Sequence, residues 1–483
     1  MSAAASTAPA PVPASGVTAT AGQAAQRAAA APATAALLSG PLLPLLLRFA
    51  LPNMGAMLAT ALAAIAETAY VGSFGVPALA GMALVFPMVM FQNMLSAGAM
   101  GGGVSSAISR ALGAGDAARA NALAVHAVWI AVAAGLLTMV AMLAGGPALF
   151  ALLGGRGEAL AQAVAYANVA FLGAVAVWLV NTLASVLRGS GNMAGPSAVV
   201  IAVALGQVAV GGALGLGWGP LPRWGMAGVA AGQVVANGVA ALFMLAYLGS
   251  GRARLRLSMR ATPLQAALLR DILKVGALAC LSPLQTVLTI LVLTRLVAQF
   301  GPDALAGYGI GARLEFLLVP IAFAIGVASV PLVGMAIGAG QIARARRAAW
   351  TAAVMATLVL AVLGAVVALA PDLWTRRFTQ AEGVVQAAAL YFHWAGPCYG
   401  LFGLGLSLYF SSLGAGRVGA MVLAGTLRLA LVALGGWWLA SQQAAPWTIF
   451  ALVAAGMAAY GLASVLAMRL TAWGPASPAS LRR

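Results

Sequence analysis

Charged side chains are scarce in this chain: they make up 7% of its 483 residues, whereas hydrophobic residues make up 63%. Soluble domains carry about 25% charged residues, so the composition excludes a soluble protein. Only eight residues are acidic and only two are histidines. The chain shows no nucleophile–base–acid set and no cluster of metal ligands, so the sequence predicts no enzymatic activity and no cofactor.

Cysteine and phosphate-binding motifs are equally sparse. Cys280 and Cys398 both fall inside apolar runs, as small buried hydrophobic residues do, and they imply neither a disulfide framework nor a metal site. The segment GAGDAARA (113–120) lacks the GK[ST] ending of a phosphate loop and any preceding strand. Work done by this protein must therefore draw on an ion gradient and not on ATP bound by the chain.

Long apolar runs recur along the whole chain, and each has about the 20 residues that cross roughly 30 Å of hydrocarbon. They predict an all-α integral membrane protein with twelve transmembrane helices, broken at glycine, proline and charge clusters. The expected spans are 44–71, 79–108, 121–145, 160–187, 196–217, 225–248, 272–299, 304–335, 348–370, 388–411, 419–440 and 447–470.

The positive residues set the expected orientation. Of the 25 lysines and arginines, 18 fall on the side that carries both predicted termini, and four fall on the other side. The positive-inside rule then places both termini in the cytoplasm and the protein in the cell (inner) membrane. The net charge of +17 is thereby explained by loops at a lipid surface, and no nucleic-acid partner is expected.

Short motifs recur at a nearly constant offset. Gly-Ala-Gly at 113–115 repeats at 338–340, an offset of 225, and Ala-Leu-Ala-Gly at 78–81 repeats at 304–307, an offset of 226. Six spans per repeat give two lobes that run the same way through the membrane, as suits a carrier with alternating access. The expected units are a disordered Ala/Pro-rich tail (1–40), an N-terminal lobe (41–248), a basic linker (249–271), a C-terminal lobe (272–470) and a cytoplasmic tail (471–483).

Glu67 is one of two acids deep within predicted spans. Asn53, Thr60 and Glu67 recur every seven residues, with Met57 between them, so they form a narrow polar stripe near one helix face. A carboxyl group held away from water favours its neutral form. Glu67 could thus load and unload protons during transport, or it could be a structural, hydrogen-bonded acid.

Glu315 is the second deep acid. It lies about 12 residues, or roughly 18 Å, beyond the loop residue Asp303, near mid-membrane. A pair with an arginine of a neighbouring helix and a coupling role are both open. Polar side chains that could line a cavity are Gln92, Asn93, Asn181, Gln285, Tyr308 and Arg313.

Several motifs together resemble one family. The span LPNMGAMLATALAAIAETAYVG (51–72), the paired GAG loops, the RGSGN turn (188–192) and AGYGIGARLE (306–315) are similar to segments of the MATE (multidrug and toxic compound extrusion) transporters. The resemblance covers about residues 42–470. It implies twelve helices in two six-helix lobes around a central cleft, and export of organic, often cationic, compounds in exchange for protons or sodium ions.

The resemblance also implies roles for particular residues. The first-helix acid of the family, usually Asp, matches Glu67, and its eighth-helix RxE element matches Arg313 and Glu315. The seventh, tenth and fifth spans lack the acids that branches of the family carry there, and the RGxGD turn ends in Asn192. This thin set of acids favours protons as the coupling ion and leaves sodium open.

We therefore expect a monomeric secondary antiporter that expels amphipathic organic compounds. The alternative is a lipid-linked oligosaccharide flippase of similar architecture, in which Arg295, Arg313 and Arg428 would hold a pyrophosphate. A receptor or scaffold is disfavoured because no extramembrane segment is long enough for signalling.

Overall fold

The computed structural model describes residues 34–258 and 262–474, and every regular element in these ranges is helical. Most of the two expected tails lies outside the described residues. The first half of the chain forms the helices α2 (Leu42–Gly72), α3 (Val76–Asn93), the π-helix η1 (Met94–Met100), α4 (Gly101–Gly113), α5 (Ala117–Leu152), α6 (Gly157–Leu172), α7 (Ala174–Gly189), α8 (Ala194–Leu216) and α9 (Gly225–Gly249).

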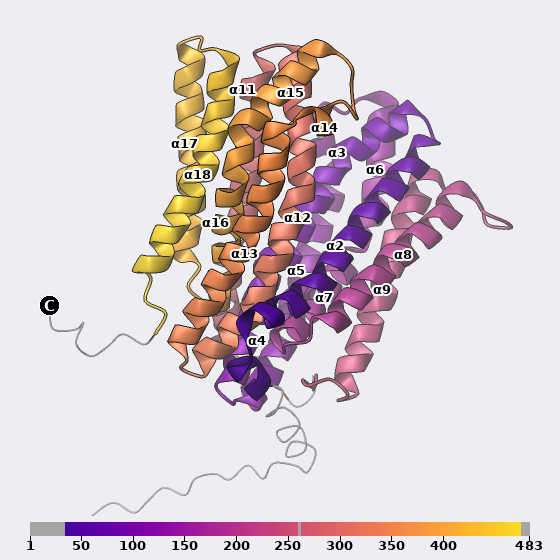
Figure 1. Cartoon of the computed structure of the whole chain (residues 1–483). Helices are drawn as coiled ribbons and strands as arrows, with labels where there is room; N and C mark the ends of the chain where they lie inside the picture. The colour runs from indigo at the N-terminus through magenta and orange to yellow at the C-terminus, as the bar shows by residue number, and fades with distance from the viewer. Residues whose placement is uncertain (1–33, 259–261, 475–483) are drawn as a thin grey trace, which may run out of the picture.

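The second half repeats this arrangement. In Figure 1 its helices, coloured salmon to yellow, lie on one side of the bundle, and those of the first half, indigo to pink, lie on the other. They are α10 (Ala266–Ala279), α11 (Leu281–Ala298), α12 (Pro302–Gly338), α13 (Ile342–Leu369), α14 (Asp372–Thr375), α15 (Glu382–Ala395), the 3-10 helix η3 (Gly396–Cys398), α16 (Tyr399–Gly414), α17 (Gly419–Ser441) and α18 (Pro446–Leu470).

Ten helical stretches in the described ranges are long and apolar enough to cross a membrane, and an eleventh forms if α6 and α7, bent by 49° at Gly173, count as one span. The predicted span 388–411 is present as α15 and α16, interrupted by the 3-10 turn of η3. Pro397 lies in that turn, where its ring and missing N–H prevent a regular α-helix. The fold is thus an all-helical membrane protein, with breaks in two of the expected spans.

The duplication is visible in the backbone as well as in the sequence. Gly115 and Gly340 both adopt a positive φ, 77° and 73°, as do Gly191 and Gly416, 88° and 70°. Each pair is separated by the offset of 225 seen in the motifs. Positive φ favours glycine because it has no Cβ, so the repeated turns explain why these glycines recur.

The two halves have separate cores at one end of the bundle and a shared core at the other. One core cluster contains only buried residues between Val71 and Ala230, and another only residues between Leu293 and Met457. Two further clusters mix the halves, for example Met335 with first-half residues. We call the end with the shared cores the arginine-rich end, because Arg110, Arg119, Arg188, Arg254, Arg344 and Arg346 lie there.

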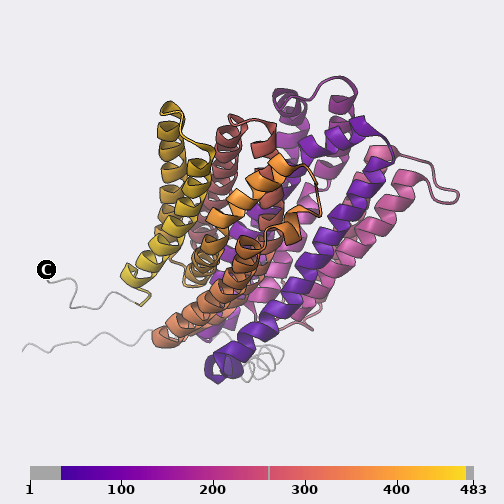
Figure 2. The same ribbon diagram turned by 45° about the horizontal axis from the view of Figure 1, so that its top comes forward.

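Helix α2 links these two regions. Near its start, Phe49 and Ala50 join a core built mainly from second-half residues. Farther along, α2 packs against α8, and Figure 2 shows α2 beside the α8–α9 pair along one side of the bundle. The end of α2 that carries Glu67 therefore lies within the first lobe.

Candidate functional site

The carboxylate of Glu67 lies at the α2–α8 contact. Its side chain is 5% exposed, and its Oε1 accepts a hydrogen bond of 2.6 Å from Nε2 of Gln207, in the middle of α8. No cation pairs with this carboxylate among the described residues. A buried carboxylate normally needs a charged partner, so a neutral amide as its sole printed partner suits a group that changes its protonation state.

Aromatic side chains surround this position. Tyr166 of α6 is buried and lies close enough to interact electrostatically with Glu67. Tyr70, one turn after Glu67, packs edge to face against Trp218 with ring centroids 6.2 Å apart. These rings keep water away from the acid while leaving it inside the first lobe.

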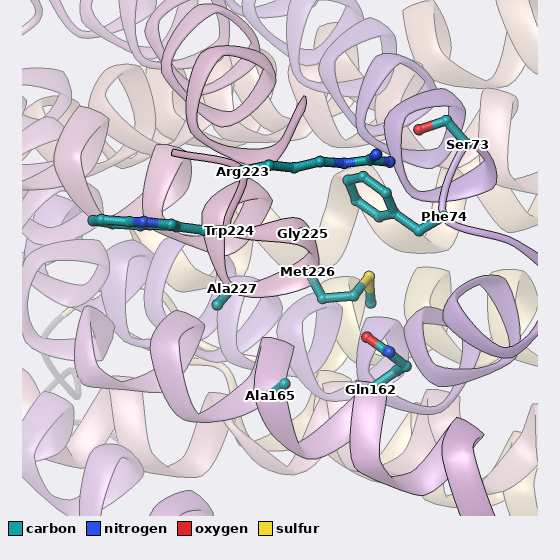
Figure 3. Close-up of a pocket in the computed structure, with 9 residues that line it drawn as sticks. All are labelled: Ser73, Phe74, Gln162, Ala165, Arg223, Trp224, Gly225, Met226 and Ala227. Carbon is teal, nitrogen blue, oxygen red and sulfur yellow. The ribbon is translucent and has the colours of Figure 1, made fainter. Parts of the chain in front are cut away.

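A pocket of about 440 Å³ opens next to the end of α2. Figure 3 shows Arg223 lying over the ring of Phe74, with its guanidinium carbon 5.3 Å from the ring centroid, and Met226 and Gln162 below them. The pocket is lined by residues of α6 and of the segment that begins α9. It gives the first lobe a wide, amphipathic surface at the end opposite the arginine-rich end.

The polar stripe of α2 is divided among three environments. Asn53 is 1% exposed and neither of its amide atoms has a hydrogen-bond partner in the described part of the chain. Thr60 is exposed and donates to the carbonyl of Ala56 at 3.0 Å, and Met57 is half-buried. Only Glu67 contacts α8, so the common face expected from the seven-residue spacing does not form one continuous site.

The first lobe holds a second polar cluster around the π-helix. Asn181 of α7 donates its amide to Oδ1 of Asn93 at 3.3 Å and to Oγ of Ser96 at 2.8 Å. Gln92 is buried beside them and its Nε2 has no hydrogen-bond partner within the described ranges. Three of the predicted cavity residues are thus gathered at η1, and π-helical turns are frequent at functional sites.

Glu315 belongs to a tyrosine cluster in the second lobe. Its Oε1 accepts a hydrogen bond from the hydroxyl of Tyr391, and the Tyr391 ring packs edge to face against Tyr308 with centroids 5.6 Å apart. Arg428 is close enough to interact electrostatically with Glu315. Glu315 and Glu67 lie in different lobes and share no partner among the described residues, so the two acids do not form one ion site.

The remaining predicted residues are spread over the second lobe. Gln285 donates to Thr426 Oγ1 at 2.8 Å, which ties α11 to α17. Arg313 is exposed and lies over the ring of Phe378, whereas Arg428 lies over that of Phe402. These two arginines stack on different rings, so the described residues show no shared cradle for a pyrophosphate.

Polar contacts also tie the lobes together at the arginine-rich end. Asp271 of α10 pairs with Arg110 at 3.0 Å and with Arg119 at 2.8 Å. Arg110 also donates to Ser106, whose hydroxyl donates to the carbonyls of Leu413 and Gly414 in α16. The sequence predicts Asp271 to be an ordinary solvated loop acid, but the folded chain places it between two arginines of the other lobe.

The variant Asp271→Asn should weaken this contact between the lobes. It removes the carboxylate that two guanidinium groups share, and because the groups are partly exposed we expect a loss of about 1–2 kcal/mol. The thermal unfolding midpoint should fall by a few degrees. The matched control is Glu158→Gln, which removes an exposed acid without an ion-pair partner in the described residues; equal midpoints for both variants would contradict the role of Asp271.

Comparison with known proteins then identifies the family. Residues 52–211 and 279–438, which together form most of the chain, each match the MatE family model. The chain belongs to the MATE transporter family. It is therefore a multi-pass membrane transporter and not an enzyme.

Curated relatives of this MATE protein have related names. A FAD transporter of Shewanella oneidensis is 27% identical over 319 residues, covering 65% of this chain and 69% of the relative. The probable multidrug resistance protein NorM of Thermotoga maritima is 26% identical over 352 residues, covering 71% and 74%. The multidrug export protein MepA of Staphylococcus aureus is 29% identical over 282 residues, covering 57% and 60%.

Solved structures share the same fold. A MOP superfamily transporter from Pyrococcus furiosus superimposes with a TM-score of 0.83 at 22% identity, covering 90% of this chain and 97% of that one. A multidrug resistance MATE family transporter in an outward-facing conformation gives the same values. The two family-model matches coincide with the two repeats, so the duplication predicted from the motifs is confirmed.

Three partners in these clusters are absent from the candidate residues of the sequence analysis. They are Gln207, which binds Glu67, Tyr391, which binds Glu315, and Ser96, which binds Asn181. Gln207 offers a signal, since it is the one side-chain amide in the apolar span 196–217. Tyr391 and Ser96 offer none, because single tyrosines and serines are common in membrane helices.

Proposed function

We propose that this MATE protein is a secondary antiporter that exports amphipathic organic compounds, often cationic, in exchange for protons, with sodium as the alternative coupling ion. The two lobes would rock about the contacts at the arginine-rich end, which exposes the first-lobe site to each side in turn. We place the arginine-rich end and both termini in the cytoplasm of a cell (inner) membrane protein by the positive-inside rule. We take the working unit to be a monomer.

The observation that carries this proposal is the environment of Glu67. The acid is buried in one lobe, it accepts one hydrogen bond from a neutral amide, and no cation of the described chain pairs with it. A proton can therefore join or leave without breaking an ion pair. A sodium ion at the same oxygen would instead meet the N–H group that Gln207 directs at it.

The cargo surface fits compounds with an apolar body and a positive or polar group. The pocket beside α2 combines the rings of Phe74 and Trp224 with the thioether of Met226 and the amide of Gln162. Flexible thioethers and flat rings adapt to varied shapes. The names of the relatives cover multidrug export and FAD transport, so a flavin nucleotide belongs in the test beside an organic cation.

Transport by reconstituted protein tests this function. Proteoliposomes with an imposed pH gradient and no sodium are expected to accumulate ethidium against its gradient, and a protonophore should abolish the accumulation. Under a sodium gradient at equal pH on both sides, accumulation should stay at the level of protein-free vesicles. FAD in place of ethidium shows whether anionic cargo is carried.

Two outcomes would contradict the proposal. Accumulation driven by sodium alone would reject proton coupling but keep antiport. Failure of both gradients to drive ethidium or FAD, together with rescue of a strain deficient in a lipid-linked oligosaccharide flippase, would reject the exporter and support the alternative of the sequence analysis.

A further inference from the structure

Arg188 is a buried cation without a counter-charge. It lies in the last turn of α7 with 4% of its surface exposed, and its Nε and other guanidinium nitrogens have no hydrogen-bond or ion-pair partner in the described ranges. The sequence places Arg188 among the surface arginines of the positive-inside side, so its burial is a finding of the structure. Burying a charge alone costs several kcal/mol, so an arrangement that persists needs a compensating group.

None of the eight acids of the chain compensates Arg188. Asp271 pairs with Arg110 and Arg119, and Asp372 and Glu382 pair with Arg376 at the other end. Glu67 and Glu315 are bound by Gln207 and Tyr391, Asp116 accepts from the backbone of Arg119, and Glu158 and Asp303 form no ion pair. Protein carboxylates therefore leave the charge of Arg188 unbalanced.

Nearby carbonyl groups are also engaged. The oxygen of Leu187 accepts from the backbone N–H groups of Ser190 and Asn192 and from the hydroxyl of Ser190, and that of Ser190 accepts from Arg254 at 2.8 Å. A carbonyl oxygen has two lone pairs, so the turn after α7 has little capacity left for the guanidinium of Arg188. The missing partner must then come from outside the chain.

Arg188 lines a small cavity between the lobes, and a second unpaired donor lines it too. The cavity leaves about 10 Å³ for the centre of a water-sized particle, and its walls include Ser185 of α7, Ser105 of α4, and Val327 and Val330 of α12. Ser105 is 4% exposed and its hydroxyl has no hydrogen-bond partner in the described residues. The hydroxyl of Ser185 already donates to the carbonyl of Asn181 at 2.8 Å.

We propose that this cavity binds one monatomic anion, chloride in the cell, between the guanidinium of Arg188 and the hydroxyl of Ser105. A space of this size holds about one particle as large as water, which admits a halide and excludes sulfate or phosphate. Two unpaired donors and no acid create the demand for a negative charge there. Because one wall belongs to α12 of the second lobe, the anion binds only while the lobes are closed at the arginine-rich end, and it stabilises that closed state.

The test measures the unfolding midpoint of the purified full-length protein in sodium chloride and in sodium gluconate of equal ionic strength. We expect the midpoint to rise by a few degrees in chloride, to saturate with chloride concentration, to rise likewise in bromide and not to rise in sulfate. Equilibrium dialysis with radioactive chloride should show one bound ion per chain. Equal midpoints in chloride and gluconate together with no bound chloride would overturn the proposal.

Variants locate the site. Arg188→Gln should abolish the chloride response and should be more stable than the wild type in gluconate, because the unpaired charge is gone. Its control, Arg252→Gln, removes an exposed arginine of the linker and should keep the full response. A merely structural role for Arg188 predicts instead a loss of stability in both salts.

A conservative pair keeps the test decisive if Arg188→Gln does not fold. Ser105→Ala should weaken chloride binding severalfold, whereas Ser407→Ala, which removes a buried and likewise unpaired hydroxyl of α16, should leave it unchanged. Equal chloride affinity in these two variants would overturn the assignment of the cavity. Neither readout depends on transport, so failure of the proposed antiport would not affect this result.

Discussion

Glu67→Gln is expected to reduce substrate-driven proton movement in proteoliposomes to the level of protein-free vesicles. The amide is nearly the same size as the carboxyl group and cannot take up or release a proton in the physiological range. The new amide oxygen can still accept the hydrogen bond of Gln207, so replacing a charge-assisted bond by a neutral one should cost only about 1 kcal/mol of folding stability. Transport should therefore be lost in a protein that remains folded.

The measurement is the pH change inside vesicles when an organic cation is added outside. Glu67→Asp gives a graded comparison, since it keeps a titratable group but shortens the chain, so that the 2.6 Å contact with Gln207 must lengthen; partial activity is expected. The control Glu158→Gln removes an exposed acid of the same lobe and should transport normally. Undiminished proton movement in Glu67→Gln would remove Glu67 from the mechanism.

The burial of Glu67 was predictable, but its partner was not. A lone acid late in an apolar run must be buried by neighbours, and the sequence shows this directly. Which helix supplies the partner depends on packing between segments about 140 residues apart, and periodicity within one helix contains no such information. The same limit explains the polar stripe: spacing predicts a shared face, but α2 passes from the second lobe to α8, so Asn53 and Glu67 meet different neighbours.

The repeat was predictable in more detail because glycine reports backbone geometry. The GAG and RGSGN motifs predict helix ends, and Gly115, Gly191, Gly340 and Gly416 take the positive φ that such ends require. The breaks at Gly173 and η3 and the π-helix η1 were not predicted. Apolar composition continues across them, and a window that measures only hydrophobicity reads each as part of one straight span.

Glycines at the lobe contact lead to the second large effect. Gly113 at the end of α4 and Gly338 at the end of α12 are related by the repeat offset of 225, and the helices cross at these two residues. A Cβ on Gly113 would overlap the backbone of Met335, and one on Gly338 would overlap the carbonyl oxygen of Arg110. Both positions are helical, so close approach and not backbone conformation explains the glycine.

Gly338→Ala should therefore open the arginine-rich end. Alanine is favoured over glycine within a helix by up to about 1 kcal/mol, but here its methyl group meets a rigid backbone of the other lobe, and overpacking costs about 1–3 kcal/mol. The closed state should lose population, and transport should fall by about tenfold. The matched control is Gly309→Ala in the same helix, where a Cβ meets nothing within 4 Å, so stability should stay equal or rise slightly.

A natural cysteine can report this opening. Cys280 is half-buried and packs against both shared cores at the arginine-rich end, so parting of the lobes should expose its thiol. With Cys398 replaced by serine, maleimide labelling of Cys280 should be several times faster in Gly338→Ala than in Gly309→Ala or in the parent. Equal labelling and equal transport in all three would show that the lobes tolerate a methyl group at this crossing. Faster labelling with slower transport would show that closing at this end, once per cycle, depends on two glycines placed there by the duplication.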